Sequence, residues 1–581
     1  MDVSITLKLK WIAISGSNLA TFVGLALGAV AQSTPPPGVT IPPNTPNTIE
    51  QTIPNPSDLP PPLPSESPAS PPEPSLQTPS TPQPPETTVP SSVGFPVNKV
   101  EVLGSTVLQE EIAQITQQYE NREVTFEELL ELRSKITQLY IEKGYITSGA
   151  FLPNNQNLSD GTVQIQVVEG ELEQIEVRGL SHLRAGYVRS RLELATKKPL
   201  NRQRLERALQ LLQLDPLLEQ VNAELTAGSG SGRNILLVEL EEAPAFHAGV
   251  STANNQSPSI GSVQTNLFVA HDNLLGFGDR FSAEYGFTNG LDLYGINYAI
   301  PVNARDGTLS FRYNTSDSRI IEKDFEDLGI RSESQTLSLS FRQPIVRSPE
   351  REFALSLGLD LRRSQTFLLD DIPFSFSEGP ENGESKVTVI RFSQDWQKRN
   401  PNRILAARSQ FSVGLNAFDA TINDTGTDGR FFSWLGQFQW VQRLSSRTVL
   451  LARIDTQLTP DSLLSLERFS MGGGDTVRGY RQNQLVADNG ILGSVEVRIP
   501  LTSDPRTLQL IPFFDIGTAW NNQDSDPNPA TIASLGLGLR WLIGSDLDLR
   551  LDYGIPLIQV DNQGNSLQEN GLYFSVRYQP F

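Results

Sequence analysis

Apolar and polar residues alternate along many short segments of residues 245–581. In residues 547–553 the odd positions are apolar and the even positions are charged. The same period of two recurs in residues 336–342, 405–416 and 432–440. This period puts successive side chains on opposite faces of a strand, so that one face meets lipid and the other meets water. A soluble sandwich also alternates, but it seldom keeps charges on its second face so consistently. The pattern predicts a transmembrane antiparallel β-barrel over residues 245–581.

The spacing of the turns predicts the number and the direction of these strands. About 16 alternating segments fit into the region, an even number as in bacterial single-chain barrels. If the chain enters from the periplasm, connections on that side are short turns, whereas the opposite ones can be long. The short links lie near residues 303–307, 348–350, 399–402, 445–447, 503–505 and 544–546, and the long ones include residues 314–334, 367–385 and 460–490. This parity predicts a periplasmic entry.

The region before the barrel predicts a compact α/β unit at residues 95–170. Its expected elements are a strand at 99–103, a helix at 107–118, a second helix, and strands at 146–152 and 163–168. A capping box from Thr125 to Glu128 opens the second helix. Four apolar residues share one face of this helix, which is the spacing needed to cover a small sheet. They are Leu129, Leu132, Ile136 and Leu139.

A second unit, residues 171–244, repeats this order. Its strand at 174–178 precedes a helix with one leucine stripe, a break at Asp215-Pro216, and strands near 220–225 and 234–241. The stripe consists of Leu205, Leu209 and Leu212. Each unit is expected to leave one sheet edge open, and such edges invite pairing by an extended partner chain.

The N-terminal part is typical of a secretory signal peptide followed by a linker. Residues 1–31 are typical of a secretory signal peptide, with Lys8 and Lys10 before an apolar stretch and a small-residue cleavage site that ends at Ala31. Polar residues within the stretch disfavour the alternative of a membrane anchor. Residues 32–94 are rich in proline and poor in apolar side chains, which predicts an extended, disordered tether rather than a packed core. Threading through a cell-wall layer or docking a partner is the less favoured role.

Composition excludes several classes of function. Lys and Arg number 46 against 66 acidic residues, for a formal charge of −20, and no basic tract occurs, which argues against nucleic acid as a partner. The chain has no cysteine, so thiolate metal sites and cysteine nucleophiles are excluded. Three histidines, His182, His247 and His271, lie on unrelated predicted elements and suggest neither a metal site nor a catalytic triad. We therefore expect no enzyme activity, no catalytic residues, no cofactor and no metal.

Two short motifs in the barrel carry the candidate chemistry. The longest predicted external loop, between strands 11 and 12, contains Val477, Arg478, Gly479 and Tyr480 in succession. Strand 13 contains the spaced residues Phe513, Asp515 and Gly517, and Asp515 falls on the lumen-facing phase. An arginine on a loop is usually solvated. If this loop folds inward, however, Arg478 can form a charge-assisted, two-point bond to the Asp515 carboxylate.

With further motifs in the α/β units, the chain resembles the outer-membrane transporters of two-partner secretion, the ShlB/FhaC/HecB (hemolysin-activator) family of POTRA-bearing barrels. The first unit carries Tyr140, Gly144 and Tyr145 in the family's spacing, then Pro153 and Gly170; the second carries Asp215-Pro216 after its leucine stripe. The resemblance covers roughly residues 95–581. Both barrel motifs occur in order and on the expected elements, which makes the signal specific.

This resemblance implies a mechanism and a location. Two POTRA domains, residues 95–170 and 171–244, would bind an unfolded exoprotein in the periplasm by strand augmentation, and the barrel would pass it across the outer membrane without ATP. Arg478 and Asp515 would hold the loop in its working position. The implied partners are the exoprotein, outer-membrane lipids, and the barrel assembly machinery during biogenesis. The family's N-terminal plug helix has no evident counterpart, because the proline-rich segment occupies its position.

Two other functions compete with secretion. A factor that assembles other barrels or lipids into the membrane belongs to the same superfamily, but such factors usually have more POTRA units than two. A passive porin for small solutes does not explain the periplasmic units. The sequence does not identify the secreted substrate, or say whether export activates it.

Overall fold

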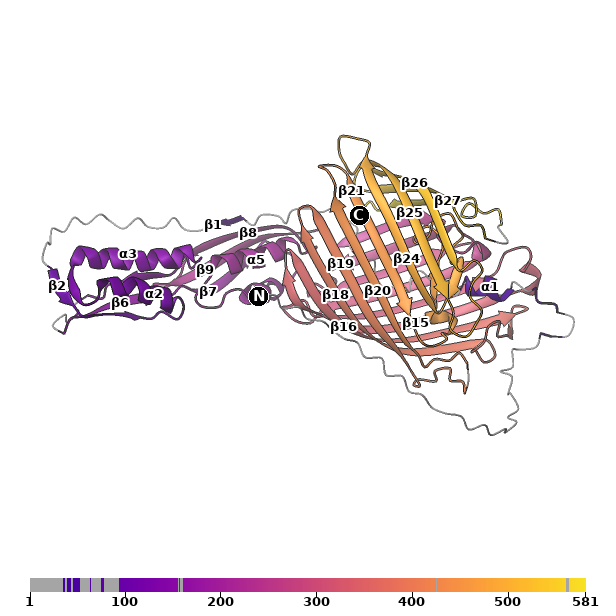
Figure 1. The fold of residues 1–581 in the computed structure, drawn as a ribbon, viewed down its shortest axis with the longest axis horizontal. Helices are drawn as coiled ribbons and strands as arrows, with labels where there is room; N and C mark the ends of the chain where they lie inside the picture. The colour runs from indigo at the N-terminus through magenta and orange to yellow at the C-terminus, as the bar shows by residue number, and fades with distance from the viewer. Residues whose placement is uncertain are drawn as a thin grey trace, which may run out of the picture.

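The computed structural model consists of a rod of two α/β units that leads into a barrel (Figure 1). It describes residues 35–36, 39–42, 45–52, 63, 75–77, 94–154, 156, 160–424, 426–560 and 564–581. The predicted signal peptide, residues 1–31, lies outside the described residues. Among the helices of the described ranges, none is long and apolar enough to cross a bilayer.

The barrel is closed, because its last strand pairs with its first. Strand β17 (Ile372–Pro373) only extends the hairpin of β16 and β18, which pair directly, so sixteen strands form the wall. They are β10 (Phe246–Ala253), β11 (Gln264–Asp272), β12 (Arg280–Phe287), β13 (Leu291–Pro301), β14 (Thr308–Arg319), β15 (Arg331–Ser348), β16 (Arg351–Leu368), β18 (Glu384–Asn400), β19 (Arg403–Leu415), β20 (Phe432–Arg443), β21 (Val449–Leu458), β24 (Asn489–Pro500), β25 (Leu508–Trp520), β26 (Thr531–Ile543), β27 (Leu547–Pro556) and β28 (Leu572–Tyr578). The predicted antiparallel barrel is confirmed.

The alternation in the sequence places apolar side chains on the outer face of the barrel and polar side chains on its inner face. On β20, Phe438 and Trp440 are exposed on the outside, whereas Gln439 between them is buried on the lumen side. The loop expected at 314–334 is shorter than predicted, because β14 runs to Arg319 and β15 begins at Arg331. Polar residues occupy both faces of these strand ends, so the alternation stops before the backbone pairing does.

The first α/β unit packs its helices on a small sheet. Strands β3 (Lys99–Leu103), β6 (Thr162–Val168) and β5 (Gly149–Phe151) form the sheet, and β2 (Gly94–Val97) pairs with β4 (Arg122–Thr125) beside it. Helices α2 (Gln109–Thr116) and α3 (Phe126–Glu142) supply the apolar face. The predicted capping box of Thr125 and Glu128 opens α3. Strand β4 is an element that the sequence pattern did not predict.

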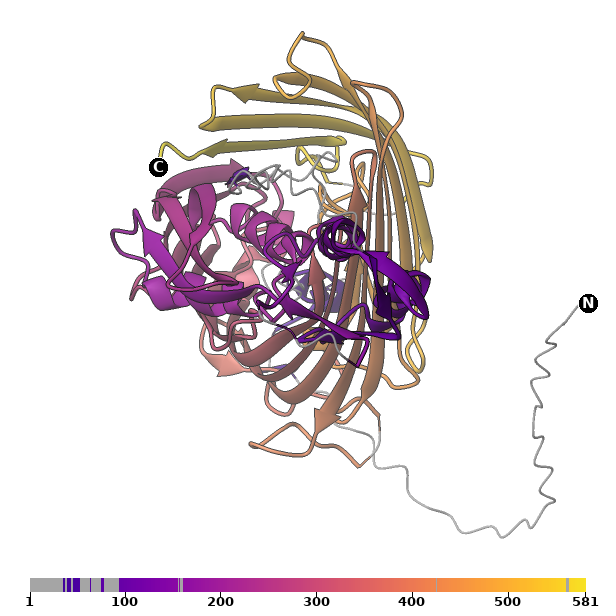
Figure 2. The same cartoon turned by 90° about the vertical axis from the view of Figure 1, so that its left-hand side faces the viewer.

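The second unit has a sheet of the order β1-β8-β9-β7, in which β1 (Ser75–Gln77) comes from the proline-rich segment. The leucine stripe of α5 (Arg202–Gln213) packs on the sheet of β7 (Glu171–Arg178), β8 (Leu218–Ala227) and β9 (Arg233–Glu242). Helix α4 (Ala185–Glu193) was not predicted, because its buried stripe is only Val188 and Leu192. Viewed from their own side, the units stand before one end of the barrel (Figure 2).

The proline-rich segment does more than tether the units, which corrects the expectation that it cannot pack. Helix α1 (Thr45–Glu50) lies at the end of the barrel that faces away from the units (Figure 1). Its Ile49 is 2% exposed and belongs to an apolar cluster of the external loops, with residues such as Phe325 and Phe374. Val39 and Ile41 of the same segment are half-buried against this cluster, and the loops supply the rest of the core. The segment therefore provides the helix in the barrel mouth that the sequence did not reveal.

Candidate functional site

The longest connection of the barrel, residues 459–488 between β21 and β24, folds back into the lumen; we call it loop 6. It contains the short strands β22 (Phe469–Met471) and β23 (Leu485–Ala487), which pair with each other. Its side chains form ion pairs with β16 and β18 on one side of the lumen, and with β24 and β25 on the other. Loop 6 therefore spans the pore.

Arg478 of loop 6 and Asp515 of β25 form a buried, two-point ion pair. The arginine Nε donates to Asp515 Oδ2 at 2.7 Å, and Nη2 donates to Oδ1 at 2.8 Å. The backbone N–H of Arg478 reaches Oδ2 at 3.2 Å, and the Ser494 hydroxyl donates to Oδ1 at 2.6 Å. Arg478 is 2% exposed and Asp515 0%. Two parallel bonds fix the plane of the guanidinium, so the contact sets the orientation of loop 6 as well as its position.

Further charges surround this pair. Glu496 of β24 accepts from Arg478 Nη1 at 2.8 Å and from Arg550 Nη2 at 3.0 Å. Asp552 accepts from Arg550 Nε at 2.7 Å, and Arg498 lies 3.7 Å from Glu496. The network balances three arginines against three carboxylates. Because buried charges are tolerated only when they are paired, this balance makes the site sensitive to the loss of any one member.

The other motif side chains shape the surroundings of the pair. The ring of Phe513 lies under the Arg478 guanidinium, with 3.4 Å from the guanidinium carbon to the ring centroid. Gly517 leaves room for Met471 of loop 6, since a Cβ there would lie 2.5 Å from the methionine sulfur. Val477 is fully buried in the same apolar cluster as Met471. These contacts pack loop 6 against β25 on both sides of the Arg478–Asp515 ion pair.

The backbone after Arg478 approaches β27 closely. Gly479 has a φ of +97°, and its N–H donates to the Tyr573 hydroxyl at 2.8 Å. A Cβ on Gly554 of β27 would lie 2.6 Å from the Gly479 nitrogen, so two glycines are needed where the chains cross. The hydroxyl of Tyr480, which is 1% exposed, lies 2.8 Å from the carbonyl oxygen of Ala533. All four residues of the loop motif are therefore immobilised against the wall.

A second anchor, on strands β16 and β18, holds the start of loop 6. Glu467 accepts from Arg362 of β16 at 2.8 Å, and from Arg391 of β18 at 2.8 and 3.0 Å. The Glu467 side chain is 5% exposed and that of Arg362 is 8%. The sequence pattern does not single out these residues. The alternation of β16 and β18 places both arginines on the lumen side. That position predicts a carboxylate partner, but it does not identify which carboxylate.

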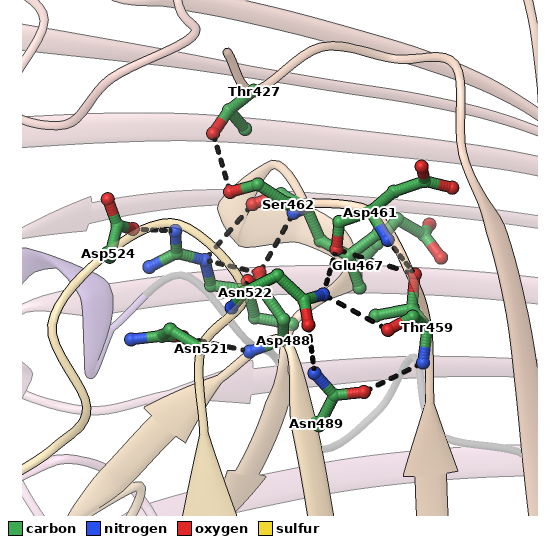
Figure 3. Close-up of polar contacts among 12 residues, drawn as sticks. Thr427, Thr459, Asp461, Ser462, Glu467, Asp488, Asn489, Asn521, Asn522 and Asp524 are labelled. Atoms are coloured by element: carbon green, nitrogen blue, oxygen red, sulfur yellow. Dashed lines mark hydrogen bonds and ion pairs between the residues drawn. The ribbon is translucent and has the colours of Figure 1, made fainter. Parts of the chain in front are cut away.

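A third anchor joins both ends of loop 6 to the next external loop, residues 521–530 (Figure 3). Asp488 accepts backbone N–H bonds from Leu463 at 2.8 Å and from Asn522 at 3.0 Å. The Asn522 side-chain amide donates to the carbonyls of Thr459 at 3.0 Å and Asp461 at 2.6 Å. These short polar side chains tie backbone to backbone, so the two ends of loop 6 stay together.

Arg468 of loop 6 connects this third anchor to α1. Its guanidinium donates to Asp524 at 2.5 Å and to Glu50 of α1 at 3.0 Å. Farther along loop 6, the Asn483 side chain donates to the carbonyl of Gln51 at 2.9 Å. Helix α1 therefore rests directly on loop 6, and the two together occupy the outer end of the lumen.

Two of the predicted motif residues, Tyr140 and Tyr145, lie in the core of the first α/β unit. Tyr140 is fully buried and its hydroxyl lies 3.0 Å from Glu169, which also accepts the Thr106 N–H at 2.7 Å. Burial favours the protonated form of Glu169, but the hydrogen bonds outweigh it and hold the pKa of this carboxyl below its usual value. Tyr145 packs edge-on against Tyr140, with ring centroids 5.8 Å apart. Tyr140 and Tyr145 thus build the core end of the unit.

The two motif glycines of this unit lie at the junction with the second unit. Gly144 accepts the Arg202 N–H at 2.9 Å, and Gly170 accepts the Leu200 N–H at 2.7 Å. A side chain at Gly170 would collide with Thr147. Both glycines therefore allow the backbones of the two units to meet.

The remaining motif residues lie apart from these. Asp215 accepts the Tyr187 hydroxyl at 2.7 Å and the Leu217 N–H at 3.1 Å, and so ends α5 with a turn at Pro216. Pro153 lies in the loop after β5 and joins none of the other motif residues.

Helix α4 docks the second unit on the periplasmic turns of the barrel. Arg191 Nε donates to Asp306 in the turn between β13 and β14 at 3.0 Å, and Arg347 of β15 pairs with the same carboxylate. The guanidinium carbon of Arg184 lies 3.6 Å from the ring centroid of Phe277, in the turn between β11 and β12. The sequence pattern does not reveal this interface, because the interface joins single residues of distant segments.

The histidines and acidic residues of the described chain do not cluster as possible metal ligands. In the described part of the chain, no group of three or more metal-ligating side chains converges on one point. The rings of His182 and His271, expected on unrelated elements, lie 6.3 Å apart at the junction of the second unit with the barrel.

Comparisons with known proteins agree with this arrangement. The family model of the haemolysin secretion/activation protein ShlB/FhaC/HecB matches residues 232–541, more than half of the chain, and that of the ShlB-type POTRA domain matches residues 95–170. The outer membrane transporter CdiB of Escherichia coli is 26% identical over 80% of this chain and 80% of its own length. The heme/hemopexin transporter protein HuxB of Haemophilus influenzae is 25% identical, over 83% and 86%.

A solved structure of CdiB from Escherichia coli has the same fold, with a TM-score of 0.64 at 24% identity over 86% of this chain and 92% of that one. The loop motif, the strand motif and most of the barrel lie in one matched region, and a POTRA domain precedes it. The chain belongs to the ShlB/FhaC/HecB family of haemolysin secretion/activation proteins.

Proposed function

We propose that this protein is the outer-membrane pore of a two-partner secretion pathway, which takes an unfolded exoprotein from the periplasm and passes it across the outer membrane. The observation that carries the proposal is a closed sixteen-strand barrel whose lumen is spanned by loop 6, with two α/β units at its short-turn end. The family membership supports export of a protein rather than diffusion of small solutes.

The POTRA domains act first, as binding modules. Sheet edges recognise an extended chain through its backbone, which suits a substrate that arrives unfolded and has no fixed shape. The contacts of α4 with the barrel turns then hold the bound segment close to the pore entrance.

Loop 6 acts as a latch, and Arg478 with Asp515 positions it. The pair is buried and bonded at two points, so it defines one working position of the loop rather than a range of positions. The other motif residues pack loop 6 against the barrel wall in this position. They are Val477, Gly479, Tyr480, Phe513 and Gly517. The motif residues of the units, Tyr140, Gly144, Tyr145, Pro153, Gly170, Asp215 and Pro216, serve folding and the junction between units.

Several finer assignments belong to the same proposal. We expect cleavage of residues 1–31 after Ala31, and insertion of the barrel into lipid by the barrel assembly machinery. The division into a linker at 32–94, POTRA domains at 95–170 and 171–244, and a barrel at 245–581 also stays a prediction. Transport is the role of the chain. We also propose that the chain has no catalytic residue.

Deletion of the gene tests this function. The proteins in the culture medium of the deletion strain are compared with those of the parent and of a strain that carries the gene on a plasmid. Secretion predicts that one large exoprotein disappears from the medium and returns on complementation. The alternative function, assembly of other outer-membrane proteins, predicts instead a general loss of barrels from the outer membrane. An unchanged set of secreted proteins would contradict the proposal.

A further inference from the structure

The turn between β11 and β12, residues 273–279, differs from the other periplasmic turns of the barrel. It presents three large apolar side chains, since Leu274 is 41% exposed, Leu275 54% and Phe277 41%. The turns at residues 303–307, 348–350, 399–402, 445–447, 503–505 and 544–546 contain no large apolar residue within these bounds. Exposed apolar side chains that occur singly are ordinary, whereas a contiguous group of them marks an interaction surface.

Buried polar side chains hold the backbone of this turn. Asp279 is 0% exposed, and its carboxylate accepts the N–H groups of Leu275 at 3.0 and 3.1 Å and of Phe277 at 3.3 Å. The buried Asn273 side chain accepts the Gly278 N–H at 2.9 Å, and the Asn273 N–H donates to the Asp279 carbonyl at 2.5 Å. These polar groups fill the interior of the turn, so its apolar side chains are left at the surface.

The second unit bonds to carbonyl groups of the same turn. The Arg184 N–H donates to the Gly276 carbonyl at 3.0 Å, and Nε2 of His182 lies 3.3 Å from the Leu274 carbonyl oxygen. A backbone segment enters a bilayer without penalty only where its polar groups are satisfied without water. The bonded N–H and carbonyl groups of this turn meet that condition. A protein partner that adds as a strand needs free backbone groups, and these are already in use.

The apolar surface of the turn continues the lipid-facing band of the barrel. Leu267 and Val269 are exposed on the outer face of β11, and the turn follows this strand directly. The exposed Phe246 of the neighbouring strand β10 extends the surface. Two exposed arginines, Arg184 and Arg280, flank the turn. Leucine and phenylalanine beside basic side chains are typical of a surface that enters the boundary between phospholipid headgroups and acyl chains.

We propose that the turn between β11 and β12 inserts Leu274, Leu275 and Phe277 into the inner leaflet of the outer membrane, with phospholipid as the partner of this surface. Because the second unit bonds to the same turn, the leaflet also supports the position of that unit at the barrel rim. The contact goes beyond the proposed function, since it does not depend on which protein is exported and is present in a barrel that exports nothing.

Fluorescence quenching measures the depth of the turn. The chain contains no cysteine, so Leu275→Cys introduces one site for the environment-sensitive dye NBD in the full-length protein. The protein is reconstituted into vesicles of phosphatidylethanolamine and phosphatidylglycerol, with or without a phospholipid that carries a nitroxide near the top of an acyl chain. Insertion to the headgroup boundary predicts blue-shifted emission, of which the nitroxide quenches about half.

Two labelled positions calibrate this result. Ser446→Cys, exposed in the turn between β20 and β21, should keep the emission of the dye in water and resist quenching. Leu267→Cys, in the lipid-facing band, gives the value for full immersion. Emission at position 275 that matches position 446 overturns the inference. A disulfide-linked dimer of unlabelled Leu275→Cys, without quenching of the labelled protein, also overturns it and assigns the surface to a second copy.

Hydrogen exchange tests the support of the second unit. Leu274→Ser with Leu275→Ser leaves Asn273 and Asp279 in place, so the turn keeps its internal bonds. In the same vesicles, this variant should exchange several-fold faster than wild type in α4, because the turn no longer rests in the leaflet. The matched control, Leu444→Ser with Leu501→Ser, removes exposed leucines from two other periplasmic turns and should leave α4 unchanged. Equal exchange in the turn variant and wild type overturns the support of the second unit.

Discussion

Replacement of Arg478 by alanine removes the side chain that joins loop 6 to three strands of the barrel. The substitution deletes two hydrogen bonds to Asp515 and one to Glu496, together with the contact on Phe513. It leaves the Asp515 carboxylate, 0% exposed, with only the Ser494 hydroxyl and the backbone N–H at position 478 as donors.

The size of the effect follows from that burial. Removal of one partner from a buried ion pair costs about 3 to 5 kcal/mol. Since about 1.4 kcal/mol corresponds to a factor of ten, the docked position of loop 6 loses roughly two to three and a half powers of ten in population. Asp515→Asn removes the orphaned charge, so Arg478→Ala should cost much less when it is introduced into an Asp515→Asn protein. Arg478→Lys keeps the charge but loses the two-point bond, and should lie between wild type and alanine.

Secretion and loop position are measured on the same cells. We expect Arg478→Ala to form a folded barrel, seen as heat-modifiable mobility on a gel, that secretes poorly. Trypsin added to intact cells should cleave loop 6 at Arg481, which is 8% exposed in the docked loop. A variant that secretes normally and keeps Arg481 protected would refute the role that we assign to the pair.

Three other substitutions test the remaining contacts. Glu467→Gln should release the start of loop 6 from Arg391 at a cost of about 3 to 5 kcal/mol and raise the conductance of the pore in planar bilayers; unchanged conductance would contradict the anchor. Glu169→Gln should weaken the first POTRA domain by about 1 to 3 kcal/mol at neutral pH, measured by hydrogen exchange in the whole protein. Because the folded-state pKa of Glu169 is lowered, its stabilisation is present above the ordinary pKa and lost as the pH falls through the lowered one, so the two proteins should converge in acid; an equal difference at all pH values would be inconsistent. Arg191→Ala should lose about 1.5 to 3 kcal/mol of docking to Asp306 and increase hydrogen exchange in the β13–β14 turn, with no change in the barrel strands.

The parts of the fold that the sequence predicted follow local rules. Each barrel strand repeats its own period of two, so counting and parity yield sixteen strands without any tertiary information. The phase of strand β25 also placed Asp515 in the lumen, where the structure has it against Arg478. The capping box at Thr125 is equally local, since its two hydrogen bonds join residues three apart.

The parts that were missed depend on distant contacts. Helix α1 has six residues and one buried apolar side chain, Ile49, which is too little for a helix to form alone. Strand β1 pairs over three residues with β8, more than a hundred positions away in sequence. The phase of Arg391 indicates a lumen charge, but nothing local selects Glu467 among the carboxylates of a long loop. Such elements form only because the barrel and the POTRA sheet already exist.

The relative strength of these contacts predicts the order in which the pore opens. Helix α1 is held by the burial of Ile49, which contributes about 1.5 to 3 kcal/mol, by the ion pair of Glu50 with Arg468, and by the bond of Asn483 to the Gln51 carbonyl. Loop 6 is held by two further groups of buried ion pairs, those of Glu467 with β16 and β18 and those of Arg478 with β24 and β25, each of which costs about 3 to 5 kcal/mol to break. The helix must therefore leave before the loop moves, because its removal disturbs no buried ion pair of Arg478 or Glu467.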